Sequence, residues 1–268
     1  MNDIKELIKQ QKINEACSFC INQLREDPLA VNTRALYIEL LCLLGELEKA
    51  DQQLDLMLRQ HPDYVAGVVN LRQLIRAASA RRDFYHAGMT ASVFGEPDPM
   101  FKAQLTLRLA LHEQDLQSAI AAATELESNR GSAPVIVNGD DYAVIRDLDD
   151  SLNGYLELFG TDGKFYLAKF DEIEHLAFKP AQSLLDTVWR RAEVFIKNGP
   201  QGEVFVPMTY MGSSDISSRL GRDTDWQQHD DRLVIGTGLK MLLVGDSALP
   251  LNAVNTITSA VSANSAVN

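Results

Sequence analysis

Apolar residues in the first half of the chain recur every three or four positions, the spacing of one buried helix face. Leu36, Leu40 and Leu44 mark the clearest run, which stops at Gly45. The same periodicity predicts two short helices within residues 3–26 and further helices at 32–44, 47–60, 64–81, 100–112 and 116–127. The first half of the chain is therefore expected to be helical.

The helical region repeats itself. Pro28 and Pro62 stand 34 residues apart, and Ala16 and Ala50 have the same separation. Similar turn segments occupy residues 11–16, 45–50 and 114–119. A 34-residue period of helix–turn–helix units is typical of tetratricopeptide repeats (TPR), which stack and leave a concave surface free for a partner. The third unit is displaced by an inserted helix and loop.

After residue 131 the pattern changes to short apolar runs separated by turn residues. Asn138-Gly139 joins one pair of such runs, and residues 160–163 and 197–202 join two more, as in β-hairpins. We therefore expect an α+β protein. A TPR-like α–α superhelix would occupy residues 1–130, an antiparallel, small barrel-like β domain residues 131–250, and a flexible tail residues 251–268.

Charge and composition narrow the function. The 268-residue chain has a formal net charge of −12, so it lacks the basic stripe that nucleic-acid binding requires. The N-terminus does not resemble a signal peptide, and no stretch reaches the roughly 18 apolar residues of a membrane span. We expect a cytoplasmic protein with no nucleic-acid partner and no membrane insertion.

Metal and cofactor motifs are weak. Cys17 and Cys20 match C-x-x-C but lie inside a helical pattern, so these thiols and Cys42 are interpreted as buried core residues. The five histidines are scattered without a metal-binding pair. We expect no metal and no cofactor.

Two groups of charged residues need interpretation. Asp147, Asp149, Asp150 and Glu157 cluster around a predicted hairpin without EF-hand spacing, and a solvated acidic turn is the preferred reading. Arginines recur at helical spacing on the helix at 64–81, where they form either a solvated face or part of a groove for an acidic ligand. These arginines are Arg72, Arg76, Arg81 and Arg82.

A series of segments, in order, resembles one known family. Leu40-Leu-Cys-Leu-Leu-Gly45-Glu-Leu-Glu-Lys-Ala50 and Val93-Phe-Gly-Glu-Pro-Asp-Pro99 lie in the helical half. The β half contributes residues 138–150, Gly163-Lys-Phe-Tyr-Leu-Ala-Lys-Phe-Asp-Glu-Ile173, Val188-Trp189, Val206-Pro-Met-Thr-Tyr210 and Gly238-Leu-Lys-Met-Leu242. Together they are similar to the ImpE/TagJ (SciE-type) family of bacterial type VI secretion accessory proteins, over about residues 1–250.

The resemblance implies a non-catalytic adaptor that binds the N-terminal helix of the small sheath subunit, TssB, and assists sheath recycling by the ClpV ATPase. It supplies no map of binding residues, so the groove is predicted from repeat geometry alone. The predicted groove residues are Asn32, Ala35, Glu39, Cys42, Gln73 and Arg76. The loop residues Phe94, Glu96 and Pro97 could contact the partner or pack on the core.

Two other functions stay open. A hydrolase-like enzyme could use the region of Asp147–Asp150 and Tyr210, although no catalytic residues are identified. Such an enzyme would need a pocket with converging titratable groups between the domains. A self-associating scaffold would instead show a large exposed apolar patch on the repeat face.

Overall fold

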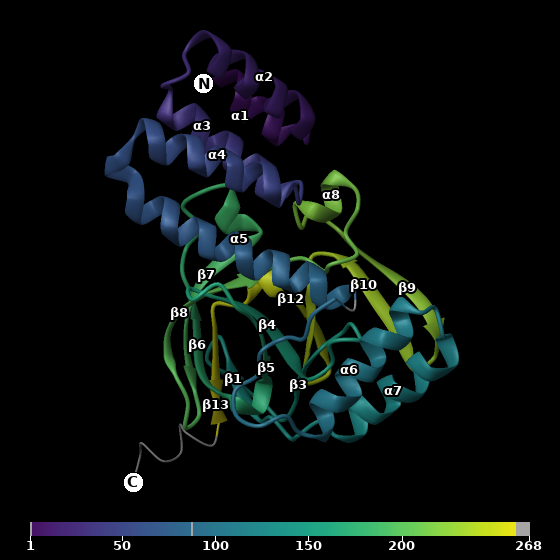
Figure 1. Ribbon diagram of the computed structural model, residues 1–268. Helices are drawn as coiled ribbons and strands as arrows, with labels where there is room; N and C mark the ends of the chain where they lie inside the picture. Colours follow the sequence, from purple (N-terminus) through teal and green to yellow (C-terminus); the bar gives the residue numbers. More distant parts are fainter. Residues whose placement is uncertain (1, 87, 261–268) are drawn as a thin grey trace.

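The computed structural model describes residues 2–86 and 88–260, and its chain divides into an α-helical first half and a β-rich second half (Figure 1). The helices lie close to the predicted positions. They are α1 (Asn2–Lys9), α2 (Ile13–Glu26), α3 (Val31–Leu43), α4 (Leu47–Gln60), α5 (Val65–Tyr85), α6 (Pro99–His112) and α7 (Leu116–Ser128), with the short 3-10 helix η1 (Pro62–Tyr64) before α5. The α+β class is confirmed.

Three helix–turn–helix junctions share one local geometry. Gln11, Gly45 and Gln114 have left-handed backbones with φ of 63°, 76° and 61°. At each junction the following N–H donates to the carbonyl five residues back, as Glu46 does to Leu41 at 2.9 Å. This is the Schellman arrangement, which favours glycine at the left-handed position. The alanine five residues beyond each left-handed residue (Ala16, Ala50 and Ala119) is fully buried, so paired helices approach closely.

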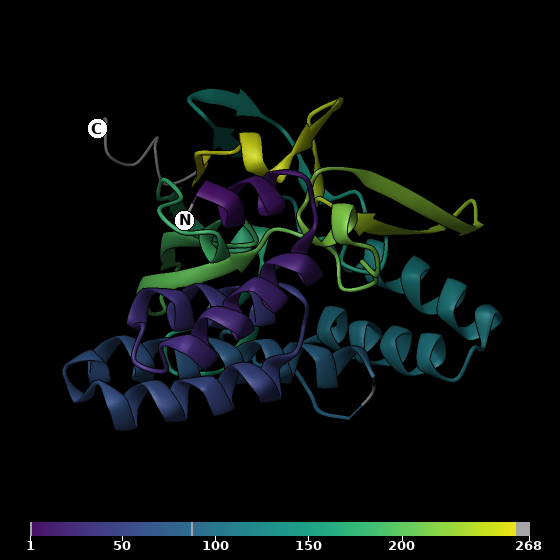
Figure 2. The same cartoon turned by 90° about the horizontal axis from the view of Figure 1, so that it is seen from above.

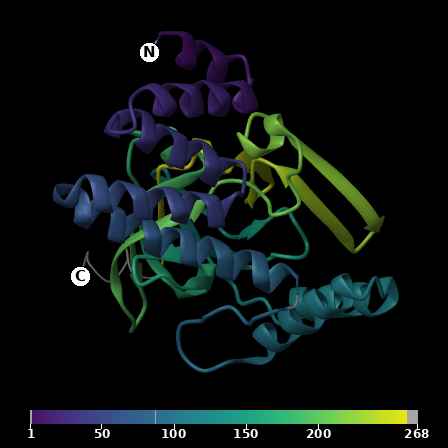
Figure 3. The same cartoon turned by 45° about the horizontal axis from the view of Figure 1, so that its top comes forward.

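The helices form two groups. Figures 2 and 3 show α1 to α5 as a staggered row of neighbouring helices, while the α6–α7 hairpin lies apart from the first helices. Residues 86–98, which separate α5 from α6, contain no helix among their described members. All three cysteines are buried and free of disulfides, as expected from the sequence.

Among the residues that the structure describes, the β half forms three antiparallel sheets. The eight-stranded sheet has the order β2-β1-β13-β6-β7-β8-β4-β5, the three-stranded sheet β12-β11-β3, and the hairpin β10-β9 stands alone. The strands are β1 (Val135–Val137), β2 (Asp140–Tyr142), β3 (Ile145–Asp147), β4 (Tyr155–Gly160), β5 (Phe165–Lys169), β6 (Ile173–Phe178), β7 (Trp189–Ile196), β8 (Gln201–Pro207), β9 (Thr224–Asp230), β10 (Leu233–Gly238), β11 (Met241–Val244), β12 (Ser247–Pro250) and β13 (Thr256–Ser259). Short helices η2 (Phe170–Glu172), η3 (Leu185–Thr187), α8 (Ile216–Arg219) and η4 (Leu251–Ala253) connect them.

Two sequence expectations for the β half need correction. The large sheet is open, because within the described residues its edge strands β2 and β5 do not pair with each other, so it is not a closed barrel. The expected tail from residue 251 instead supplies η4 and β13, and β13 lies between β1 and β6 with Ile257 fully buried. Residues 261–268 of that expected tail lie outside the described residues.

The eight-stranded sheet is buried on both faces at β4. Tyr155 and Phe159 pack with α5 and α6 residues such as Phe84 and Phe101, while Leu156 and Leu158 belong to a second apolar cluster within the β half. Because side chains alternate along a strand, Glu157 shares the helix-facing side with Tyr155 and Phe159. The sheet therefore places a carboxylate under α5.

Candidate functional site

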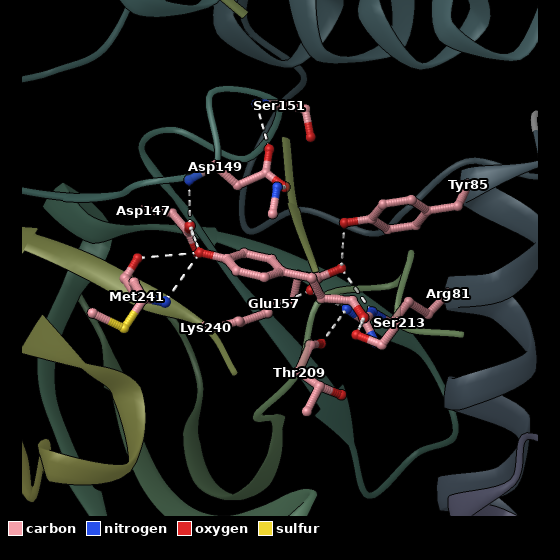
Figure 4. A network of polar contacts seen from close by, with 12 residues as sticks. Arg81, Tyr85, Asp147, Asp149, Ser151, Glu157, Thr209, Ser213, Lys240 and Met241 are labelled. Carbon is pink, nitrogen blue, oxygen red and sulfur yellow. Dashed lines mark hydrogen bonds and ion pairs between the residues drawn. The ribbon is translucent and has the colours of Figure 1, made fainter. Parts of the chain in front are cut away.

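A buried charge network joins α5 to the sheets, with Glu157 at its centre (Figure 4). Arg81 donates from Nε and Nη2 to the two Glu157 oxygens at 2.8 and 2.6 Å. Lys240 forms an ion pair with Glu157 Oε2, and Tyr85 Oη donates to Oε1 at 3.0 Å. The Glu157 and Lys240 side chains have no exposed surface, and Arg81 Nη2 also donates to the Thr209 carbonyl.

Glu157 is held in its ionised form. Burial alone would raise the pKa of this carboxyl, but the adjacent Arg81 and Lys240 hold the pKa at about 2. Bidentate geometry from a planar guanidinium strengthens the pair, and the lysine and tyrosine satisfy remaining lone pairs. The carboxylate is therefore saturated with donors and has no free position for a substrate proton.

A second part of the network surrounds Asp147 at the end of β3. Tyr210 Oη donates to Asp147 Oδ1 at 2.7 Å, and the Asp149 N–H donates to the same oxygen at 2.8 Å. The Met241 N–H donates to Tyr210 Oη at 3.0 Å. Burial, with a further contribution from Asp149, raises the pKa of Asp147 to about 7, although Lys240 acts in the opposite direction.

Asp149 and Arg108 connect this part to α6. Asp149 accepts from the backbone N–H groups of Ser151 at 2.7 Å and Gly236 at 3.0 Å. Arg108 Nη2 donates to the Ser151 carbonyl at 2.6 Å, and its guanidinium lies 4.0 Å from the centre of the Tyr85 ring. Helix α6 is thus tied to the β3–β4 connection and, through the Tyr85 ring, to α5.

The expected solvated acidic turn is wrong. Asp147, Asp149 and Glu157 are each at most 3% exposed, and Asp150 is paired with Arg146. Their partners come from distant segments, since Arg81 and Lys240 lie 76 and 83 residues from Glu157 in the chain. Burial of Arg81 also shows that the arginines of α5 are not one solvated face; Arg72, by contrast, pairs with Asp51 and Asp55 near the surface.

One edge of the network opens into a cleft of about 620 Å³ between the α6–α7 hairpin and the β9–β10 hairpin. Tyr85, Arg108 and Asp149 reach it from the network. His229, Ile235 and other residues of the two hairpins line the rest. Titratable groups do meet between the halves, but Asp149 is already bonded to two backbone N–H groups. No group of metal-binding side chains occurs within residues 2–86 and 88–260.

The β half of the chain matches a known protein family. Residues 139–258 match the family model described as ImpE protein. The match covers the β3–β4 connection and Lys240, and so most of the charge network on the β side. Residues 139–258 of the chain belong to the ImpE family.

Two relatives extend the likeness to the helical half. The type VI secretion system accessory component TagJ of Pseudomonas aeruginosa is 25% identical over 256 residues, covering 91% of this chain and 87% of that protein. The crystal structure of protein VPA1032 from Vibrio parahaemolyticus is 34% identical and has a TM-score of 0.92, covering 96% of this chain and 97% of that chain. In the part of this protein that the structure describes, no helix is suited to crossing a bilayer.

The residues predicted to form a partner groove do not lie on one open surface. Glu39 is half-buried and accepts from the Leu185 N–H of η3 at 3.1 Å, and Cys42 is 4% exposed. Gln73 and Arg76 lie at the β4–β5 turn, where a Cβ at Gly163 would be 2.5 Å from Gln73 Oε1. Asn32 is exposed and Ala35 half-buried. The β half of the protein therefore covers much of the face expected to be concave and free.

The loop between α5 and α6 has both packed and exposed residues. Ser92 pairs with Tyr166 at the edge of the eight-stranded sheet, and Phe94 stacks on the Tyr166 ring with centres 4.9 Å apart. Glu96 and Pro97 are exposed. Phe94 thus helps to cover the β5 edge, while contact of this loop with a partner stays a prediction.

Lys240 and Arg108 belong to the network but were not among the candidates predicted from the sequence. Lys240 lies in the apolar run Leu239-Lys-Met-Leu-Leu243, and a lysine in such a run signals a buried charge that needs a partner. Arg108 follows Leu107 on a largely apolar helix, which also indicates a buried charge, although less clearly. Neither signal identifies the partner, which depends on the tertiary fold.

Proposed function

We propose that this protein is an accessory component of a type VI secretion system that acts in the cytoplasm as a non-catalytic adaptor. The relationship to TagJ of Pseudomonas aeruginosa over 91% of this chain carries the proposal. The adaptor would bind the N-terminal helix of the small sheath subunit, TssB, and assist recycling of contracted sheaths by ClpV.

The geometry favours binding over catalysis. The central carboxylate Glu157 is saturated by Arg81, Lys240 and Tyr85, and Asp147 is bonded to Tyr210. A general acid or base must reach a substrate proton, which these buried and partnered groups do not. The network instead fixes α5 and α6 on the sheets. Such a rigid scaffold can present the stacked helices to a partner helix, a common mode of peptide recognition.

The first test measures fluorescence anisotropy of a labelled peptide that spans the N-terminal helix of the small sheath subunit from the same organism. A peptide of the same composition in scrambled order is the control. Saturable binding of the native peptide only is expected. Equal or absent binding of both peptides, with folded protein, would refute the adaptor function.

A second measurement addresses recycling. Contracted sheaths would be incubated with ClpV and ATP, with and without this protein, and their disassembly followed by light scattering. We expect the protein to change the rate of ClpV-driven disassembly. An unchanged rate at saturating protein would remove the recycling role and leave sheath binding to be judged by the peptide experiment.

A further inference from the structure

Apolar side chains stand exposed along the α6–α7 hairpin. Leu105 and Leu109 on α6 are 37% and 49% exposed, and Leu116 at the start of α7 is 42% exposed. Leu105 and Leu109 line a hollow of about 300 Å³ together with Met89, while Leu116 lines the cleft of about 620 Å³. Arg108 lines both hollows, so they are neighbours along one helix. We call Leu105, Arg108, Leu109 and Leu116 the α6 surface.

Arg108 is a buried cation that is only partly satisfied. Arg108 is 5% exposed. Of its guanidinium nitrogens only Nη2 forms hydrogen bonds, and both go to Ser151. Within the described residues the buried Nε has no hydrogen-bond partner. The carboxylate of Asp149 interacts electrostatically with Arg108, but its hydrogen bonds come from the Ser151 and Gly236 N–H groups. A buried N–H group without an acceptor is costly, and a carboxylate brought by a ligand would add the acceptor and the negative charge that the guanidinium still lacks at this edge.

The rest of the two hollows is suited to an anion with an apolar body. Asp149 is the sole acidic residue among their described lining residues, and its oxygens accept from the Ser151 and Gly236 N–H groups. Three imidazoles, those of His86, His112 and His229, add possible hydrogen-bond donors beside Arg108. This lining contrasts with the net charge of −12 of the whole chain.

We propose that the α6 surface binds an amphipathic helix of a partner protein, with leucine contacts along α6 and an aspartate or glutamate side chain on Arg108. The inference rests on the proposed adaptor function and names the surface and the chemistry of the partner. Leucines at positions i and i+4 match the repeat of an apolar helix face, and the partly satisfied guanidinium of Arg108 between them fixes where the acidic residue must lie. The β9–β10 hairpin projects on the same side of the molecule as α6–α7 (Figure 3). Its residues His229 and Ile235 line the larger cleft opposite α6–α7.

The α4–α5 hairpin offers a matched comparison. Leu56 and Val69 are 39% and 47% exposed there, similar to the α6 leucines. The guanidinium of Arg72 on α5 is already paired with Asp51 and Asp55. This hairpin therefore has exposed apolar side chains beside an arginine that is already paired with carboxylates. The predicted groove residue Arg76 lies on the same helix and is exposed, in contrast to the buried Arg108.

The test measures anisotropy of the sheath-subunit peptide with the native protein and with Leu109→Glu, Leu105→Glu, Leu56→Glu and Arg76→Glu variants. All the altered side chains are exposed, so folding is expected to persist and is checked by circular dichroism. We expect the two α6 variants to weaken binding at least about tenfold and the other two to change it less than about twofold. A peptide with each acidic residue changed to its amide should bind about tenfold more weakly to the native protein.

The outcomes separate the two proposals. Native binding that is unaffected by Leu105→Glu and Leu109→Glu overturns the α6 surface and leaves the adaptor function standing. Loss of binding in Arg76→Glu or Leu56→Glu alone does the same and assigns the site to the other hairpin. Undiminished binding of the amide peptide overturns the carboxylate contact with Arg108. No binding of the native peptide to the native protein refutes the adaptor function itself, and the inference with it.

Discussion

Glu157→Gln isolates the electrostatic contribution of the buried network. Glutamine has nearly the shape of glutamate and keeps one carbonyl oxygen as an acceptor, so little packing is lost. The change leaves Arg81 and Lys240, with side chains 7% and 0% exposed, without their shared counter-charge. The native free energy of unfolding should therefore fall because two cations stay buried.

The expected loss of unfolding free energy is about 3–5 kcal/mol. The Glu157 carboxyl titrates at about 2 instead of its ordinary 4.5, and this difference corresponds to about 3 kcal/mol in favour of the ionised form. Breaking a buried ion pair by removing one partner typically costs about 3–5 kcal/mol. Because a folded protein is stable by only about 5–15 kcal/mol, a loss of 3–5 kcal/mol is large.

Urea unfolding followed by tryptophan fluorescence measures this loss, since Trp189 is 8% exposed and packs on Phe159 beside the network. Glu193→Gln is the matched control. Its carboxylate pairs with Lys179 at 3.2 Å on the surface, with both side chains about half exposed, so a change below about 1 kcal/mol is expected.

A second change tests the cause. Adding Lys240→Met to Glu157→Gln removes one of the uncompensated cations and should recover part of the lost stability. A loss below about 1 kcal/mol for Glu157→Gln, or a further loss on adding Lys240→Met, would refute the view that the unpaired cations cause the destabilisation.

Two more predictions follow from the same structure. The pKa of Asp147 is raised from 3.8 to about 7, so the folded state favours the protonated carboxyl. The resulting contribution to the free energy of unfolding is complete below about pH 4 and is lost as the pH rises through 7. Asp147→Asn cannot ionise, and its advantage in unfolding free energy over the native protein should grow by about 3 kcal/mol from pH 5 to pH 8, measured by urea titration; a constant difference contradicts this. Gln114 has a left-handed backbone with φ of 61°, so Gln114→Gly should raise the free energy of unfolding by about 1 kcal/mol. Gln117→Gly, inside α7, should lower it by about 1 kcal/mol. Thermal unfolding measures both changes, and the same sign for both would contradict the shared turn geometry.

Helix positions were predictable because they depend on local signals. The apolar period, the breaks at Gly45 and Pro62, and the repeated alanine all act within one helix–turn–helix unit. Hairpins with clear turn residues, such as that around Asn138-Gly139, were predictable for the same reason. Three-dimensional pairing was not needed to recognise any of these elements.

Strands without alternating polarity were missed. The sequence of β9, Thr224–Asp230, is almost entirely polar, and most of its residues are exposed, so it lacks the period of a half-buried strand. Strand β13 is four residues long and gains its place only by pairing with β1 and β6, more than 70 residues away along the chain. Its Ser and Thr content resembles that of a tail, and only the tertiary fold distinguishes the two.

The charge network was beyond the sequence for a related reason. The acidic residues near Asp147 look solvated as long as Arg81, Arg108 and Lys240 are assigned to separate helices and strands. Their burial becomes favourable only when α5 and α6 cross the sheet and supply counter-charges and donors. A sequence pattern can indicate that Lys240 needs a partner. That this partner is Glu157 depends on how β4 is positioned under α5 in the folded chain.

The same tertiary contacts explain why the helical repeat does not present the groove that its period predicts. In a free-standing solenoid the concave face is open, because each unit contacts only its neighbours. Here Glu39 binds η3 and Gln73 lies against the β4–β5 turn, so the chain itself occupies part of that face. The inserted segment 86–98 separates the third helix–turn–helix unit from α5 and leaves Leu105 and Leu109 uncovered. A partner helix would therefore displace fewer of the protein's own contacts on α6 than on α3 or α5. The Arg108 guanidinium would favour a partner helix that carries an acidic side chain.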